Sequence, residues 1–312
     1  MTKVISIINY KGGVGKTTVT SNLAGELAFQ GFKVLMIDLD PQTNLTFSFL
    51  RVEDWEKNFQ NKTIKNWFDA FIYDDHEFNL DEIIISPNRV NLRLAELKSK
   101  GEIDLIASHL GLIEADLELS AKLWGGSKRT NLYNFLKVHS RLKEGLQQLD
   151  DEGYDVILID CPPNFNIVTK TAIIASDILI IPAKSDYLST IGMEQLKKNV
   201  DELVEEYNEK ARNDEYNNEF SEVNPKFEGV VFTMVGIRSG TPYKAQQQFI
   251  STVRRLNIPV FNTIIRENKT LFSDAPQTGV PVVLEDVSLE TYQNVREELE
   301  AFTQEVRERL GI

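Results

Sequence analysis

Eight consecutive residues near the N-terminus have the types and order needed to bind a polyphosphate. Glycines in such a run let backbone N–H groups approach phosphate oxygens, and a helix N-terminus after them adds a favourable dipole. The second lysine of the run, Lys16, would reach the β- and γ-phosphates, and the Thr17 hydroxyl would coordinate Mg²⁺. The run consists of Lys11, Gly12, Gly13, Val14, Gly15, Lys16, Thr17 and Thr18.

The residues around this run predict the elements that would hold it. Residues 3–9 are rich in β-branched side chains and predict a buried strand. Residues 19–30 carry apolar side chains at helical spacing and are followed by Gly31, which predicts a helix. A phosphate-binding loop requires a strand before its glycine-rich turn and a helix after it. A plain glycine turn with solvated lysines does not require these two elements, so their presence favours the phosphate-binding loop.

Three aspartates follow two further predicted strands. Asp38 and Asp40 end the strand that starts at Lys33, and Asp160 ends the strand that starts at Tyr154. Alternation with helices predicts parallel βαβ units, so we expect these strand ends to lie beside the phosphate loop. Buried carboxylates are costly unless a cation or a water molecule uses them, which favours metal binding or catalysis over simple helix capping.

Together these motifs resemble the deviant Walker A group of P-loop ATPases, the ParA/MinD group or ParA family. KGGVGKTT has the extra lysine of that group, with Tyr10 where the usual loop has glycine, and IDLDPQ and IDCPP resemble its second motif and its switch II segment. The resemblance implies an α/β fold with a mainly parallel central sheet flanked by helices on both faces. It implies a single ParA-like P-loop domain over residues 1–312, with a variable insertion at about 51–102.

The resemblance also implies ATP and Mg²⁺ as cofactors and assigns roles to individual residues. Residues 11–18 would bind ATP, and Lys11 would cross a dimer interface to the phosphates held by the other subunit. Asp40 would position or activate the attacking water. A turn at 266–268, which reads Arg-Glu-Asn where the family commonly has Pro-Arg-Asn, would present backbone groups to adenine. The expected catalytic residues are Lys11, Lys16 and Asp40, and the expected metal ligands are Thr17, Asp38 and Asp160.

The function implied is that of a partitioning ATPase. ATP would join two chains into a sandwich homodimer that binds non-specific DNA, and a ParB-like or adaptor protein would stimulate hydrolysis and release. The cargo could be a plasmid, a chromosome or another body such as a protein organelle. Arg238 and Lys244 are the candidate DNA contacts, and the basic run 121–143 is either a second nucleic-acid or acidic-partner surface or a solvated face. The alternative is a metabolic P-loop ligase resembling dethiobiotin synthetase.

Charge and composition limit these functions. The net charge of −13 opposes nucleic-acid binding by the whole surface, so a DNA partner would need a local basic patch. The single cysteine, Cys161, leaves no internal disulfide, fits a reducing cytoplasm and suits packing better than nucleophilic chemistry. No apolar run approaches the roughly 20 residues of a membrane span. The helix predicted over 288–310 is acidic, the wrong sign for a membrane anchor, so we expect a cytoplasmic protein, associated with the nucleoid if it binds DNA.

The rest of the chain predicts further elements of the same alternating fold. The region 51–102 predicts one helix and one short strand that pack on the main body, and residues 74–77 predict a solvated acidic turn. Residues 208–226 predict a surface loop or a frayed helix end. Further helices are expected at 63–73, 110–119, 189–207 and 241–256, and further strands at 83–85, 104–108, 178–182, 229–235 and 260–266.

Overall fold

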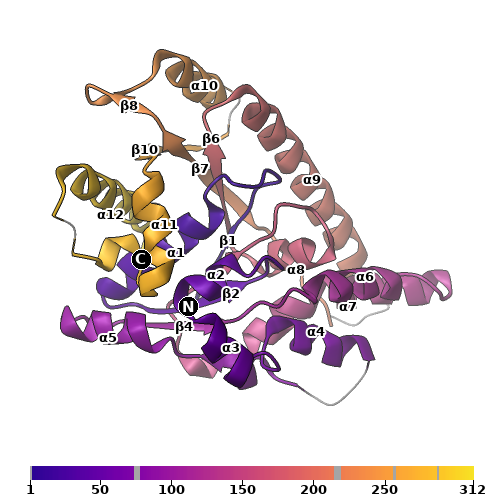
Figure 1. The fold of residues 1–312 in the computed structure, drawn as a ribbon. Helices are drawn as coiled ribbons and strands as arrows, with labels where there is room; N and C mark the ends of the chain where they lie inside the picture. Colours follow the sequence, from indigo (N-terminus) through magenta and orange to yellow (C-terminus); the bar gives the residue numbers. More distant parts are fainter. Residues whose placement is uncertain (1, 74–77, 214–218, 256–257, 287) are drawn as a thin grey trace.

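The computed structural model describes residues 2–73, 78–213, 219–255, 258–286 and 288–312. The acidic turn expected at 74–77 lies outside these residues, as does part of the loop expected at 208–226. Among the described residues, no helix is both long and apolar enough to cross a membrane. Figure 1 shows a central sheet with helices packed on its two faces.

The central sheet confirms the predicted parallel topology. Its eight strands lie in the order β10-β7-β6-β1-β5-β2-β4-β3, and each pair of neighbours is parallel except β3 and β4. The strand that carries the phosphate loop therefore lies in the middle, between the strands of Asp160 and Ile178. The strands are β1 (Lys3–Ile7), β2 (Lys33–Asp38), β3 (Ile84–Ile85), β4 (Glu102–Ile106), β5 (Val156–Asp160), β6 (Ile178–Lys184), β7 (Lys226–Val235) and β10 (Val260–Arg266).

The two faces of the sheet bury separate apolar layers. Leu35 and Ile37 of β2 belong to one hydrophobic cluster, whereas Val34 and Met36 of the same strand belong to the other. This alternation is what a strand covered on both faces requires. The first cluster is covered by α4 (Ile64–Tyr73), α6 (Leu112–Lys122), α7 (Lys128–Gln147), α8 (Ile167–Ala175) and α9 (Tyr187–Ala211), and the second by α1 (Lys16–Phe29), α2 (Asn44–Phe49), α5 (Asn88–Glu96) and α12 (Glu290–Leu310).

The region 51–102 is integrated with this core. Trp67 and Phe68 of α4 are fully buried, and β3 extends the edge of the sheet by pairing with β4. The predicted helix at 63–73 and strand at 83–85 are therefore present and pack on the main body. The region also holds α3 (Val52–Asn58), α5 and the short 3-10 helix η1 (Leu80–Ile83); further 3-10 turns are η2 (Asp150–Glu152) and η4 (Val282–Leu284).

The C-terminal third differs from the prediction most clearly at the start of its first helix. The helix predicted from residue 241 begins three residues later, as α10 (Lys244–Arg255), because a small hairpin of β8 (Ile237–Arg238) and β9 (Thr241–Pro242) precedes it. The hairpin turn places Ser239 at φ 50° and Gly240 at φ 77°, both left-handed. The remaining helix, α11 (Lys269–Thr278), follows β10 and leads back toward α1 (Figure 1).

Candidate nucleotide-binding site

The phosphate loop joins β1 to α1 in the conformation that its glycines allow. Gly13 and Gly15 have φ values of +64° and +83°, a region in which glycine carries no Cβ penalty. The helix α1 begins at Lys16, three residues before the start predicted from the apolar pattern, because the polar residues 16–18 form its first turn. The exposed N–H groups of that turn therefore point at the space enclosed by the loop, which suits an anion.

Lys16 is a buried cation inside this loop. Its side chain is 7% exposed, and its ammonium makes only long contacts of 3.4 Å with the carbonyl oxygens of Asn9 and Lys11. Burial lowers the pKa of Lys16, while the nearby Asp160 and Asp40 oppose that shift. An ammonium held this way has donor capacity left for phosphate oxygens.

Asp38 and Asp160 lie side by side at the ends of β2 and β5, as their strand positions predicted. They are register partners, and both are at most 1% exposed. Asp160 accepts a hydrogen bond of 2.6 Å from the Thr17 hydroxyl. Asp38 accepts from the Thr46 hydroxyl at 2.7 Å and from the Thr46 and Asp40 amides at 2.8 and 3.1 Å.

The two carboxyl groups destabilise each other's charge, and this bears on metal binding. Burial raises the pKa of both, and the neighbouring Asp160 raises that of Asp38 further. Two adjacent carboxylates and a hydroxyl are hard oxygen donors, which are the ligands that Mg²⁺ prefers alongside phosphate oxygens and water. The residues present therefore fit a magnesium ion held by Thr17 and Asp160, with Asp38 behind them. Asp40 is 8% exposed and acts electrostatically on both Lys16 and Asp160, which places it at the same site.

Lys11 extends away from the loop that contains it. Its ammonium forms an ion pair of 2.7 Å with Asp186 and contacts the Ser189 hydroxyl at 3.4 Å, and about a third of its side chain is exposed. Asp186 also caps α9 by accepting from the Ser189 amide at 2.8 Å. The pKa of Asp186 is lowered. Burial acts to raise this pKa, but the hydrogen bonds from Lys11 and Ser189 outweigh the effect of burial.

A cavity of roughly 270 Å³ opens next to the phosphate loop. Gly15 and Thr18 of the phosphate loop and of α1 line it, together with Thr233 and Met234 of β7. The turn at 266–269 also lines the cavity, and the family resemblance assigns adenine contacts to its residues 266–268. The Arg266 guanidinium is held by Glu298 at 2.7 Å, which anchors the start of the turn.

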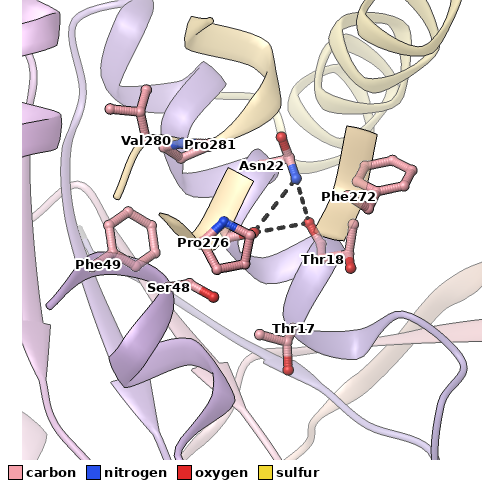
Figure 2. A pocket seen from close by; sticks show the side chains of 10 residues that line it. Thr17, Thr18, Asn22, Ser48, Phe49, Phe272, Pro276, Val280 and Pro281 are labelled. Atoms are coloured by element: carbon pink, nitrogen blue, oxygen red, sulfur yellow. Dashed lines mark hydrogen bonds between the residues drawn. The ribbon is translucent and has the colours of Figure 1, made fainter. Parts of the chain in front are cut away.

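A second, narrower cleft of roughly 40 Å³ separates α1 from α11 (Figure 2). Thr17, Thr18 and Asn22 come from α1, and Phe272 and Pro276 face them from α11, as Figure 2 shows. The Asn22 side chain donates to the Thr18 carbonyl at 2.8 Å and accepts from the Val283 amide at 3.2 Å. The C-terminal segment is thereby attached to the helix that starts at the phosphate loop.

The candidate DNA contacts lie on the surface of the hairpin and of α10. Arg238 is exposed on β8, and Lys244 is exposed as the first residue of α10. Arg254 and Arg255 are exposed in the last turn of the same helix. Figure 1 shows β8 and α10 together at the top of the view, apart from α6 and α7 at the lower right. The hairpin and α10 therefore carry exposed cations in one region of an acidic protein.

The basic run 121–143 is not a single cationic face. The Arg141 guanidinium stacks over the Trp67 ring at 4.1 Å, and Lys122 lies over the Phe71 ring at 5.5 Å. These two cations cover aromatic side chains of α4 and so contribute to packing. The exposed members of the run are Lys128, Arg129 and Lys137, all on α7.

Three residues of the site were missed by sequence reasoning. Asp186 sits where an aspartate precedes a helical pattern, so its capping role was detectable in the sequence. Thr46, which binds Asp38, and Thr233, whose hydroxyl donates to the Val14 carbonyl of the phosphate loop at 2.7 Å, have no motif that predicts them. Cys161 is fully buried, and burial raises the pKa of its thiol, as expected for a packing residue.

Comparison with known proteins places the whole chain among similar sequences and folds. The family model described as an AAA domain matches residues 2–212. The sporulation initiation inhibitor protein Soj of Bacillus subtilis is 31% identical over 288 residues, 92% of each chain. The chromosome partitioning protein ParA of Myxococcus xanthus is 27% identical over 285 residues, 91% of this chain and 82% of that protein. The structure of apo McdA from Cyanothece shares the fold with a TM-score of 0.71 at 20% identity, covering 98% of this chain and 100% of that chain.

Proposed function

The chain belongs to the ParA family of P-loop ATPases, and we propose that it is a partitioning ATPase whose DNA binding is controlled by ATP. The observation that carries this proposal is the cluster of Lys16, Thr17 and Asp160 at the N-terminus of α1, with Asp38 and Asp40 beside it. It offers a cation, a helix N-terminus and hard oxygen ligands around one space, as hydrolysis of a magnesium-bound triphosphate requires.

In this proposal ATP occupies the loop and the adjoining cavity. Lys16 and the first N–H groups of α1 hold the β- and γ-phosphates, Thr17 and Asp160 hold Mg²⁺, and Asp38 lies behind these ligands. Mg²⁺, when bound, neutralises charge on the phosphate oxygens. Asp40 orients the attacking water, so that ATP is converted to ADP and phosphate. The cavity of roughly 270 Å³ and its turn at 266–269 accept the base.

We propose a homodimer with nucleotide between its subunits, and the surroundings of Lys11 support it. Lys11 is directed out of its own loop, so its ammonium is free to reach a second chain once the ion pair with Asp186 opens. Large apolar side chains are exposed to solvent on α9, which Lys11 contacts through Asp186, and around the start of α6, and such side chains support a surface that another protein covers. They are Leu110, Ile113 and Leu117 around the start of α6, and Tyr187, Leu188 and Ile191 in the first turns of α9.

DNA binding is assigned to the exposed cations of the hairpin and α10. Backbone phosphates attract such cations without reading sequence, which suits a protein that moves over DNA. A ParB-like or adaptor protein would stimulate hydrolysis and release the dimer from DNA. The cargo would be a plasmid, a chromosome or another body, in the cytoplasm and in contact with the nucleoid.

The test is binding of the chain to a random-sequence DNA duplex with ATP or ADP at two salt concentrations. We expect salt-sensitive binding with ATP and weak binding with ADP. Replacing Arg238 and Lys244 together with glutamine should weaken binding and flatten its salt dependence. The matched control replaces Lys128 and Lys137 of α7 in the same way and should bind as the unaltered chain does. Equal affinity with the two nucleotides would contradict the proposal.

The fold alone does not separate this function from the alternative, a metabolic P-loop ligase resembling dethiobiotin synthetase. The relative named as a chromosome partitioning protein favours the partitioning ATPase. The replacement Lys11→Ala distinguishes them experimentally. It should remove dimer-dependent hydrolysis from a partitioning ATPase, whereas a ligase that works within one chain would keep its nucleotide turnover.

A further inference from the structure

One short segment connects the nucleotide cavity to the basic surface. It runs from Thr233, near the end of β7, through Gly236 to the hairpin strand β8 that carries Arg238. Thr233 is 3% exposed, and its hydroxyl donates to the Val14 carbonyl of the phosphate loop at 2.7 Å. The next residue, Met234, lines the cavity and has a φ of +53°, a left-handed conformation that a bulky side chain rarely adopts. The nucleotide cavity and the hairpin are therefore separated by only a few residues.

The turn at 266–269, which also lines the cavity, is attached to the same segment. The Glu267 amide donates to the Val235 carbonyl at 3.1 Å, and Arg266 of β10 pairs with Val235 of β7. Val235 is fully buried. A change in the spacing between this turn and β7 would therefore act on Val235, the residue directly before the hairpin connection.

Gly236 sets the position of the hairpin and of α10. Its amide donates to the Gln246 side-chain oxygen at 2.9 Å, and its carbonyl accepts from the Tyr243 amide at 3.1 Å. A Cβ at Gly236 would clash with the Tyr243 ring, so the glycine permits this close approach. Lys244 follows Tyr243 directly, and Arg238 lies two residues after Gly236. Both candidate DNA cations thus depend on contacts of one residue next to the cavity wall.

We infer that Gln246, through its bond to Gly236, is a positioning residue that couples nucleotide binding to DNA binding within each subunit. This inference rests on the proposed function, because it takes the hairpin and α10 as the DNA surface. Gln246 is not among the residues that line the two cavities described above, and it carries no charge, so we expect it to act through Gly236 and not by touching either ligand. Coupling between two binding sites is reciprocal, so DNA should raise ATP affinity by the same factor by which ATP raises DNA affinity.

The closing experiment compares Gln246→Met with the control Gln248→Met on the same helix. Gln248 is exposed, and its side chain makes no hydrogen bond to a residue that the structure describes. We measure the affinity for a random-sequence DNA duplex with a non-hydrolysable ATP analogue and with ADP, and the amount of nucleotide-induced dimer. For Gln246→Met we expect the ratio of the two DNA affinities to fall about fivefold, with dimer formation unchanged. The control should keep the ratio of the unaltered chain.

The outcomes separate this inference from the proposed function. If the unaltered chain binds DNA equally with both nucleotides, the proposed function fails. If it prefers the ATP analogue and Gln246→Met keeps that preference in full, the coupling role of Gln246 fails alone. Amide hydrogen exchange gives a readout that needs no DNA. The ATP analogue should slow amide hydrogen exchange in residues 236–255 of the unaltered chain, and the slowing should be smaller in Gln246→Met. An equal slowing in both chains would overturn the inference.

Discussion

The replacement Lys16→Met tests the central cation of the site. Methionine keeps the length and the helical preference of lysine but removes the ammonium, which lies in the loop with only long contacts to two carbonyl oxygens. In the proposed complex that ammonium makes charge-assisted hydrogen bonds to the β- and γ-phosphates. Each such bond contributes about 1.5–3 kcal/mol, so loss of both should weaken binding by at least about a hundredfold.

This loss is measurable as a loss of ligand-induced stability. A ligand present at a hundred times its dissociation constant stabilises the folded chain by about 2.7 kcal/mol. After a hundredfold loss of affinity the same concentration equals the dissociation constant, and the increment falls to about 0.4 kcal/mol. The assay is urea unfolding of each chain with and without a magnesium-bound, non-hydrolysable ATP analogue. Because the increment is a difference within one variant, any change in the stability of the free chain cancels.

A lysine at an equivalent helix position supplies the control. Lys128 is the first residue of α7, as Lys16 is of α1, but it is exposed and distant in the sequence from the phosphate loop. Lys128→Met should keep the full increment of about 2.7 kcal/mol. An increment above about 2 kcal/mol in Lys16→Met would refute the assignment of residues 11–18 as the phosphate-binding loop.

Two further predictions concern groups buried inside the fold. Thr46→Val removes the hydroxyl that donates to the buried Asp38 carboxylate and that accepts a hydrogen bond from the Ser108 amide. Urea unfolding should therefore show that the free energy of unfolding falls by about 3 kcal/mol. The control Ser48→Ala on the same helix should lower it by less than about 0.5 kcal/mol. Burial lowers the pKa of His139 to about 4, against about 6.5 in the unfolded chain, so the unfolded state binds more protons between these values. His139 alone should therefore contribute a loss of about 3 kcal/mol to the free energy of unfolding between pH 7 and pH 4. The pH profile of His139→Asn should differ from that of the unaltered chain by this amount, whatever the other buried groups contribute to both chains; identical pH profiles would contradict this account.

The site was largely predictable because its residues occupy positions that local chemistry dictates. The glycines before Lys16 and the carboxylates after two apolar strands are visible in a single sequence, and the parallel topology brings their strand ends together. The role of Thr233 was not predictable, because its hydrogen-bond partner Val14 lies 219 residues away in the sequence. Nothing in the sequence around a buried strand threonine indicates which carbonyl its hydroxyl will bind. Contacts of that kind depend on strand order, which the sequence does not state.

The basic run at 121–143 was the least reliable interpretation for a related reason. A count of charges gives the sign of a segment but not the direction of each side chain. Arg141 lies over the rings of Trp67 and Phe71, so one of the cations is used inside the fold. The spacing of the basic residues along α7 is equally consistent with a solvated face. Only the packing of α4 against α6 and α7 settles which charges remain outside.

The charge of the chain explains why the proposed DNA binding should need a dimer. The described part of the hairpin and α10 offers four exposed cations per subunit, Arg238, Lys244, Arg254 and Arg255. If all four contact phosphates, the logarithm of the affinity should change with the logarithm of salt with a slope of about −3.6, and two joined subunits would double it to about −7. A single subunit, with a net charge of −13, must bind DNA weakly at physiological salt. Joining two subunits adds the second set of contacts at high effective concentration, so hydrolysis that separates them is sufficient for release.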